Sequence, residues 1–138
     1  MEYQDETGAS SCKKCPLGKI PYDHDGVSFG CTSCKIGTFG KNDGKCHDCD
    51  GVMEYQNEVG ATSCKKCPLG KIPHSSGGFN TSCSPCPTGT FGKNDGKCHK
   101  CDGVMEYQNE IGASSCKKCN SGKYPYTLNG FNLSLIHI

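Results

Sequence analysis

The feature that most constrains this chain is the spacing of its fourteen cysteines. Every cysteine belongs to a C-x-x-C pair, and adding 52 to the number of any of the first eight gives another cysteine. The chain is therefore a tandem array with a period of 52 residues. Residues 1–52 and 53–104 are identical at 36 of 52 positions, and residues 105–132 form a truncated third repeat.

Both ends of the chain look unusual beside this repeat. Met1 matches two interior residues, Met53 and Met105. We therefore expect the chain to start in mid-protein, with any signal peptide upstream. Residues 133–138 leave the repeat and resemble a translation of the transposon-end adapter used in sequencing libraries. We expect them to be a non-native tail and exclude them from the fold.

The chain is too poor in large apolar residues to build an ordinary core. Leu, Ile, Val and Phe together number 20 of 138 residues. Ordering a residue costs about 1–2 kcal/mol of backbone entropy, which so little apolar surface does not offset. Cysteine at about a tenth of the chain must supply the stability instead, through disulfides or metal ions.

A zinc array fits the repeat poorly. A four-cysteine zinc site uses two C-x-x-C pairs, whereas each 52-residue repeat contains three pairs. Equivalent repeats would then need different groupings. His47 and His99 lie within C-H-x-C and offer further ligands, but the other pairs have no matching histidine. A redox role of C-x-x-C needs one activated thiolate, and seven near-equivalent pairs do not resemble such a site.

A disulfide ladder treats all loops alike. If the second cysteine of each pair bonds to the first cysteine of the next, every loop is closed in the same way, at roughly 3 kcal/mol each. Cys12 and Cys119 are then left unpaired, because their partners would lie outside the repeat sequence present. The predicted pairs are Cys15–Cys31, Cys34–Cys46, Cys49–Cys64, Cys67–Cys83, Cys86–Cys98 and Cys101–Cys116.

The expected fold is a small disulfide-rich, mostly irregular structure with short β-hairpins, repeated as an elongated rod without a central core. Nineteen glycines and seven prolines predict turns throughout. Asn42-Asp43-Gly44 carries the Asp-Gly signal of a tight hairpin turn. An aromatic or aliphatic residue, such as Phe39, Tyr55 or Ile20, follows the first glycine of most loops. We expect it to cover the neighbouring disulfide.

Several function classes are disfavoured by the composition. All fifteen basic residues are lysine and the net charge is +1, so there is no guanidinium group for phosphates or base edges and we expect no nucleic-acid partner. No apolar run is long enough to span a bilayer, so membrane attachment would come only through parts missing from this fragment. No constellation of catalytic side chains stands out. We therefore expect no enzyme activity, no cofactor and no metal.

Two further features concern the surface. Asn80-Thr81-Ser82 fits the N-glycosylation pattern, so Asn80 is a candidate acceptor. The two complete repeats differ mostly across residues 22–30 and 74–82. We favour an unconstrained loop there, and ligand recognition is the alternative.

The segment from Tyr3 to Gly18 resembles the ephrin-receptor-like cysteine-rich repeat, which reads roughly Y-Q-x-x-x-G-x-x-x-C-x-x-C-P-x-G. Residues 55–70 repeat it, and residues 107–122 do so with Asn120 in place of proline. Such repeats are distantly similar to modules of tumour-necrosis-factor receptors and to EGF-like modules. The resemblance implies an extracellular or cell-surface protein without shared catalytic residues.

The sequence therefore predicts an extracellular cysteine-rich segment that acts as an adhesion, ligand-binding or spacer rod. Its partner would be an extracellular protein or glycan. A ligand-binding ectodomain of a membrane signalling receptor is the first alternative. An intracellular array of four-cysteine zinc sites is the second.

Overall fold

The structure is a computed structural model that describes residues 2–5, 7–8 and 11–137. Within these residues every strand belongs to a two-stranded sheet, and no helix is present. In the described part of the chain there is consequently no helix long and apolar enough to cross a membrane. The expectation about Met1 falls outside these residues.

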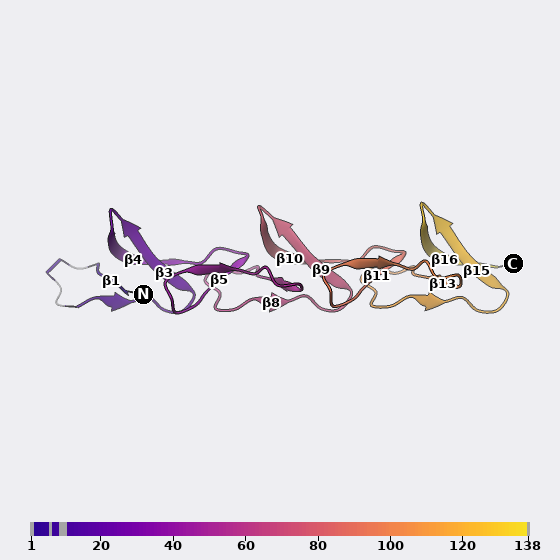
Figure 1. The fold of residues 1–138 in the computed structure, drawn as a ribbon, viewed down its shortest axis with the longest axis horizontal. Helices are drawn as coiled ribbons and strands as arrows, with labels where there is room; N and C mark the ends of the chain where they lie inside the picture. Colours follow the sequence, from indigo (N-terminus) through magenta and orange to yellow (C-terminus); the bar gives the residue numbers. More distant parts are fainter. Residues whose placement is uncertain (1, 6, 9–10, 138) are drawn as a thin grey trace. The chain divides into compact units, whose positions relative to one another are not determined.

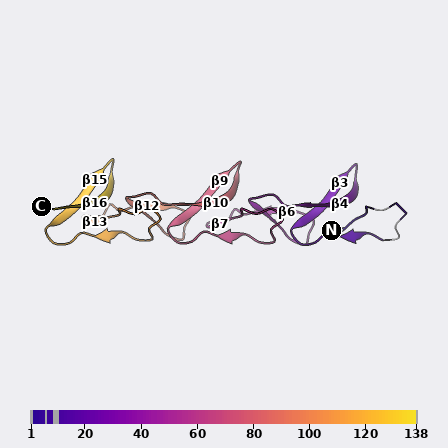
Figure 2. The ribbon, with the colours of Figure 1, turned by 180° about the vertical axis from the view of Figure 1, so that it is seen from behind.

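The strands form three kinds of hairpin that recur with the repeat (Figures 1 and 2). The long hairpins are β3 (Lys19–His24) with β4 (Val27–Ser33), β9 (Lys71–Ser76) with β10 (Phe79–Pro85), and β15 (Lys123–Leu128) with β16 (Phe131–His137). The three-residue hairpins are β5 (Thr38–Gly40) with β6 (Cys46–Asp48) and β11 (Thr90–Gly92) with β12 (Cys98–Lys100). The two-residue hairpins are β1 (Glu2–Tyr3) with β2 (Lys13–Lys14), β7 (Glu54–Tyr55) with β8 (Lys65–Lys66), and β13 (Glu106–Tyr107) with β14 (Lys117–Lys118).

The turns of the long hairpins explain why these strands pair. Asp25 and Gly26 connect β3 to β4 with φ angles of 52° and 80°. Asn129 and Gly130 connect β15 to β16 with the same two values. Two positive φ angles in a two-residue connection define the type I′ turn, whose twist matches that of the flanking strands.

The hairpin expected at Asn42-Asp43-Gly44 exists, but its turn differs from the prediction. Five residues, 41–45, separate β5 from β6, so Asp-Gly is not a two-residue connection here. Gly44 adopts a φ of 79°, and the Asp43 carboxylate accepts a hydrogen bond from the Lys45 backbone N–H at 3.1 Å. The Asp-Gly pair thus bends a longer turn.

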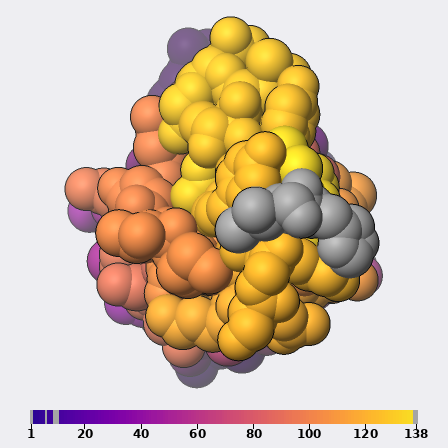
Figure 3. Space-filling view, turned by 90° about the vertical axis from the view of Figure 1, so that its right-hand side faces the viewer, coloured from indigo at the N-terminus to yellow at the C-terminus, as the bar shows by residue number. Residues whose placement is uncertain are grey.

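The chain divides into two compact units, Met1–Lys65 with Ser75–Ser82 and Lys66–His74 with Cys83–Ile138. The second unit ends in hairpin β15–β16, whose atoms lie at the surface in Figure 3. Within each unit, backbone hydrogen bonds join successive loops. Cys34 N–H donates to the Gly18 carbonyl at 3.0 Å, and Gly60 N–H donates to the Cys34 carbonyl at 2.7 Å. Cys86 stands at the centre of the equivalent pair in the second unit.

Sulfur fills the place of an apolar core in both units. The most deeply buried side chains are cysteines, with Cys34 and Cys101 at 1% exposure and Cys86 at 0%. Leu17 is 54% exposed and Val59 is 68% exposed. Phe39, Tyr55 and Ile20, expected to cover disulfides, are half-buried. The predicted class, a disulfide-rich repeat with short hairpins and no central core, is confirmed.

Candidate functional site

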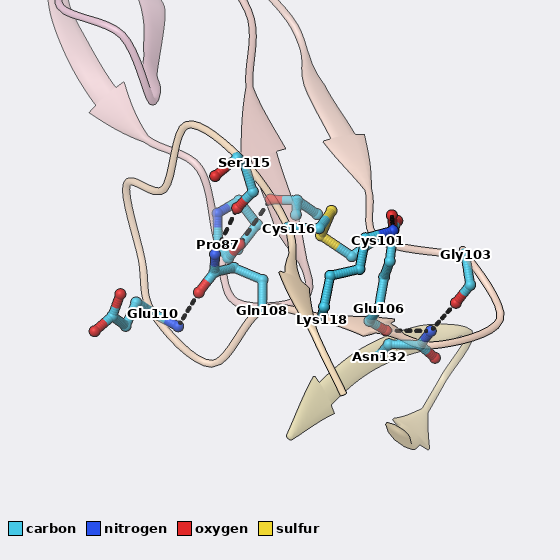
Figure 4. The surroundings of a disulfide bond; sticks show 11 residues. Pro87, Cys101, Gly103, Glu106, Gln108, Glu110, Ser115, Cys116, Lys118 and Asn132 are labelled. Atoms are coloured by element: carbon cyan, nitrogen blue, oxygen red, sulfur yellow. Dashed lines mark hydrogen bonds and ion pairs between the residues drawn. A yellow bond between two sulfur atoms is a disulfide. The ribbon is translucent and has the colours of Figure 1, made fainter. Parts of the chain in front are cut away.

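Six disulfides hold the described chain, and each closes one loop of the repeat. Every bond joins the second cysteine of one C-x-x-C pair to the first cysteine of the next, with Cα atoms 5.6–5.8 Å apart, inside the usual range. Figure 4 shows the surroundings of the last bond. The bonded pairs are Cys15–Cys31, Cys34–Cys46, Cys49–Cys64, Cys67–Cys83, Cys86–Cys98 and Cys101–Cys116.

Two cysteines are free thiols, Cys12 at the surface and Cys119 half-buried. The position equivalent to the partner of Cys119 is occupied by Leu135, which pairs across the hairpin with Pro125 as Cys31 pairs with Pro21. Strand β16 therefore has no sulfur at the place where the repeat puts the partner of Cys119. Residues 133–137 lie in strand β16, and their non-native origin stays a prediction.

The disulfides leave the cysteines little to offer a metal, because an S–S bond has no thiolate to donate. Among the residues that the structure describes, no group of three or more His, Cys, Asp or Glu side chains could hold a metal ion. His47 and His99, the further ligands considered from the sequence, instead donate from Nε2 to Asp43 and Asp95 at 2.7 Å.

Two glutamines organise the third loop of the repeat, and the sequence analysis missed them. Gln56 and Gln108 are each 2% exposed. The Gln108 side chain donates to the Ser115 carbonyl at 2.7 Å and accepts from the Glu110 backbone N–H at 2.9 Å (Figure 4). A buried amide with both ends paired fixes one loop conformation. The signal was the Tyr-Gln pair, which recurs with the cysteines.

Each of the two three-residue hairpins carries a histidine hydrogen-bonded to an aspartate, at equivalent positions of the repeat. In the first, the rings of His47 and Phe39 lie 5.6 Å apart, and the Lys41 ammonium lies 5.6 Å from the Phe39 centroid. Desolvation raises the pKa of Asp43, but hydrogen bonds from the His47 ring and the Lys45 N–H outweigh it and hold the pKa below the ordinary aspartate value. The same causes lower the pKa of Asp95.

These carboxylates predict an acid-sensitive element. An aspartate whose pKa is depressed by folding stabilises the native state above its unfolded pKa, and this contribution is lost as pH falls through the folded value. The window therefore opens near 3.8 and extends below it. We expect the melting temperature of Asp43→Asn/Asp95→Asn to fall less than that of the wild type between roughly pH 5, which lies above this window, and roughly pH 2.5, which lies below the unfolded pKa.

Asp102→Asn is the matched control, because it removes a carboxylate outside the two hairpins. It should follow the wild-type profile when melting is measured by circular dichroism. Identical acid profiles for the double variant and the wild type would show that the histidine–aspartate pairs contribute nothing to stability in acid.

The variable segments of the two complete repeats lie at the tips of long hairpins. At the first tip Tyr22, Val27 and Phe29 are 49–55% exposed. A shallow groove of about 250 Å³ lies between Val27, Phe29 and the loop residues Gln4, Asp5 and Thr7. Its described lining contains no histidine, no cysteine and no second carboxylate. The described part of the groove thus offers mainly apolar contact area, from Val27 and Phe29.

Asn80, the candidate glycosylation site, lies near the tip of the second long hairpin. It is half-buried in β10, and its Oδ1 accepts a hydrogen bond from the Ser75 hydroxyl at 2.6 Å. Its backbone carbonyl accepts the Gln56 N–H at 3.0 Å. The side chain therefore already has a partner within the hairpin, and glycosylation of Asn80 stays a prediction.

Comparison with known proteins agrees with the geometry. Residues 37–82 match the family model described as tyrosine-protein kinase ephrin type A/B receptor-like. The matched stretch contains the whole loop closed by Cys49–Cys64 and most of the loop closed by Cys34–Cys46, whose first cysteine precedes it. The resemblance noted in the sequence is thereby confirmed for this stretch. No curated protein matches the chain.

Proposed function

We propose that this chain, in which residues 37–82 form an ephrin-receptor-like cysteine-rich repeat, is an extracellular segment that holds or presents binding surfaces as a rod. One observation carries the proposal: every complete loop is closed by its own disulfide, in units whose buried apolar side chains are mostly cysteine. Disulfides of this density form and persist in oxidising compartments. Catalysis is not part of the proposed role.

The proposal of a rod rests on the way the loops are connected. Each loop bonds to its neighbours in sequence, as repeats do in other solenoid-like arrays. We expect X-ray scattering of the oxidised chain to give a radius of gyration clearly above the ~14 Å of a globule of this length. The reduced and alkylated chain, a coil of ~38 Å by the same scaling, is the comparison. A value near that of the globule would contradict the rod.

Location is tested separately from shape. An antibody raised against the oxidised chain should stain intact cells of the source organism without permeabilisation, or recover the protein from the medium. Staining that requires permeabilisation would refute an extracellular role. The unpermeabilised sample also needs a cytosolic marker that stays dark, since leaking cells would imitate the expected result.

Ligand recognition is the second candidate function, because Tyr22, Val27 and Phe29 are exposed at a tip that differs between the repeats. A binding surface on a rigid scaffold commonly uses such loops. Replacing residues 22–30 by residues 74–82 exchanges one tip for the other and keeps the disulfides. The measurement is binding of the purified oxidised chain to intact cells. Loss of this binding in the variant would favour recognition, and unchanged binding would favour the spacer role.

A further inference from the structure

The tip of each later hairpin lies against the repeat before it, and one aromatic residue makes the contact. Phe79 opens strand β10, and Phe131 opens strand β16. A Cβ atom added to Gly37 would lie 2.4 Å from the Phe79 Cβ, and one added to Gly89 would lie 2.7 Å from the Phe131 Cβ. Only glycine leaves room for either phenylalanine.

A lysine completes each contact. The Lys35 ammonium lies 4.0 Å from the centroid of the Phe79 ring, and the Lys100 ammonium lies 4.7 Å from that of Phe131. Both distances are within the range of cation–π attraction. Each phenylalanine is therefore held between a glycine and an ammonium group of the preceding repeat, an arrangement that we call the joint.

The two lysines come from different positions of the repeat. Lys35 is equivalent to Pro87, and Asp48 is equivalent to Lys100. Where one position loses its lysine, the other gains one, and the aromatic ring is still covered by an ammonium group. The interaction, rather than the residue position, is what recurs in the two joints.

A backbone relay runs beside each joint. Gly37 N–H donates to the Gln56 carbonyl at 2.7 Å, and Gln56 N–H donates to the Asn80 carbonyl at 3.0 Å. Gly89, Gln108 and Asn132 repeat both bonds at 2.7 and 2.9 Å. The relay connects the second loop, the third loop and the next hairpin, so the amide of each glutamine reports whether its hairpin is docked.

We propose that these joints are the interaction surface by which one cysteine-rich repeat holds the next. The surface is a glycine with one lysine, and the partner it fits is a long hairpin whose second strand opens with an aromatic residue. Val27 occupies this position in the first hairpin and is 53% exposed. The proposal does not depend on the location or the ligand of the protein, so it can fail without the proposed function.

Amide hydrogen exchange of the complete oxidised chain, followed by NMR, tests the first joint against the second. Lys35→Met keeps an unbranched side chain of similar length and removes the ammonium group. We expect exchange at Gln56 to become about two- to fivefold faster, the range that an exposed cation–π contact predicts. Gln108, which belongs to the other joint, should be unchanged. No acceleration at Gln56 would overturn the proposal, as would equal acceleration at both amides.

The repeat itself supplies the rescue. Lys35→Pro introduces the residue found at position 87 and should accelerate exchange at Gln56. Adding Asp48→Lys introduces the lysine found at position 100 and should restore the wild-type rate to within about twofold, because the ring regains an ammonium partner. Failure of the double variant to slow exchange relative to Lys35→Pro would contradict the interchange of lysines. Both variants leave the cysteines and glycines untouched, so we expect the fold to be retained.

Discussion

Reduction of the six disulfides is expected to unfold the chain completely. The buried apolar side chains of the two units are cysteines apart from Met53, so no apolar core remains when the S–S bonds open. Each loop of 12–16 residues between bonded cysteines contributes about 3 kcal/mol in the chain-entropy model. A small domain is stable by only about 5–15 kcal/mol in total, so the loss exceeds what the remaining hydrogen bonds supply.

The measurement is best made in a Cys12→Ser/Cys119→Ser background, which removes both free thiols and prevents cross-linking between chains. Circular dichroism and amide dispersion in NMR should collapse on addition of a phosphine reductant. Zinc added to the reduced chain should not restore them. Refolding on zinc would identify a four-cysteine metal array and would contradict the disulfide assignment.

Removing a single disulfide should destabilise the chain only in part. Cys86→Ser/Cys98→Ser opens one loop and should destabilise the chain by about 3 kcal/mol, with the largest loss of exchange protection in hairpin β11–β12. Peptide mapping of the parent should recover Cys34–Cys46 and Cys86–Cys98 as equivalent links. Recovery of any other pairing from the parent would contradict the ladder.

Gly70→Ala is expected to be among the most damaging single substitutions that retain all cysteines. Gly70 has a φ of +89°, and a Cβ atom there would lie 2.2 Å from the Gly112 carbonyl oxygen. The left-handed conformation costs alanine about 1–2 kcal/mol. The overlap with a backbone oxygen adds about 1–3 kcal/mol, because neither of the two loops can move without breaking the hydrogen bonds between them.

Gly122 is the matched control for this substitution. It occupies the equivalent turn, has a φ of +77°, and has no atom within 4 Å of an added Cβ. Gly122→Ala should therefore show the cost of the left-handed conformation alone. Thermal unfolding of the two variants, with the yield of correctly oxidised protein, separates the two terms. Equal losses would mean that the approach of Gly70 to Gly112 does not contribute to stability.

The turns show where sequence reasoning was incomplete. The Asp-Gly signal in Asn42-Asp43-Gly44 predicts a tight turn, but these residues are part of a five-residue connection. The two-residue type I′ turns lie at Asp25-Gly26 and Asn129-Gly130, which carry the same kind of signal. Local propensity identified residues that tolerate positive φ, but the length of a connection depends on where the strands pair and where the disulfide closes the loop.

The buried glutamines and the joints were not predictable in the same way. Gln56 is polar, and polarity alone predicts exposure; its burial follows from backbone groups of a loop that converge on it. Phe79 looked like a residue of a variable loop, and only the fold brings Gly37 and Lys35 against it. Contacts between segments so far apart in the chain leave no local pattern in a single sequence.

The sequence by itself determined the period, the shortage of apolar residues and the spacing of the cysteines. From these followed the disulfide-rich class and the absence of a central core, because loop-closing bonds are the remaining source of stability. The tertiary structure decided which glycines touch backbone, which amides are buried and how a hairpin meets the repeat before it. These features depend on the close approach of loops distant in sequence, so the tertiary fold decides them and no local pattern in the sequence reveals them.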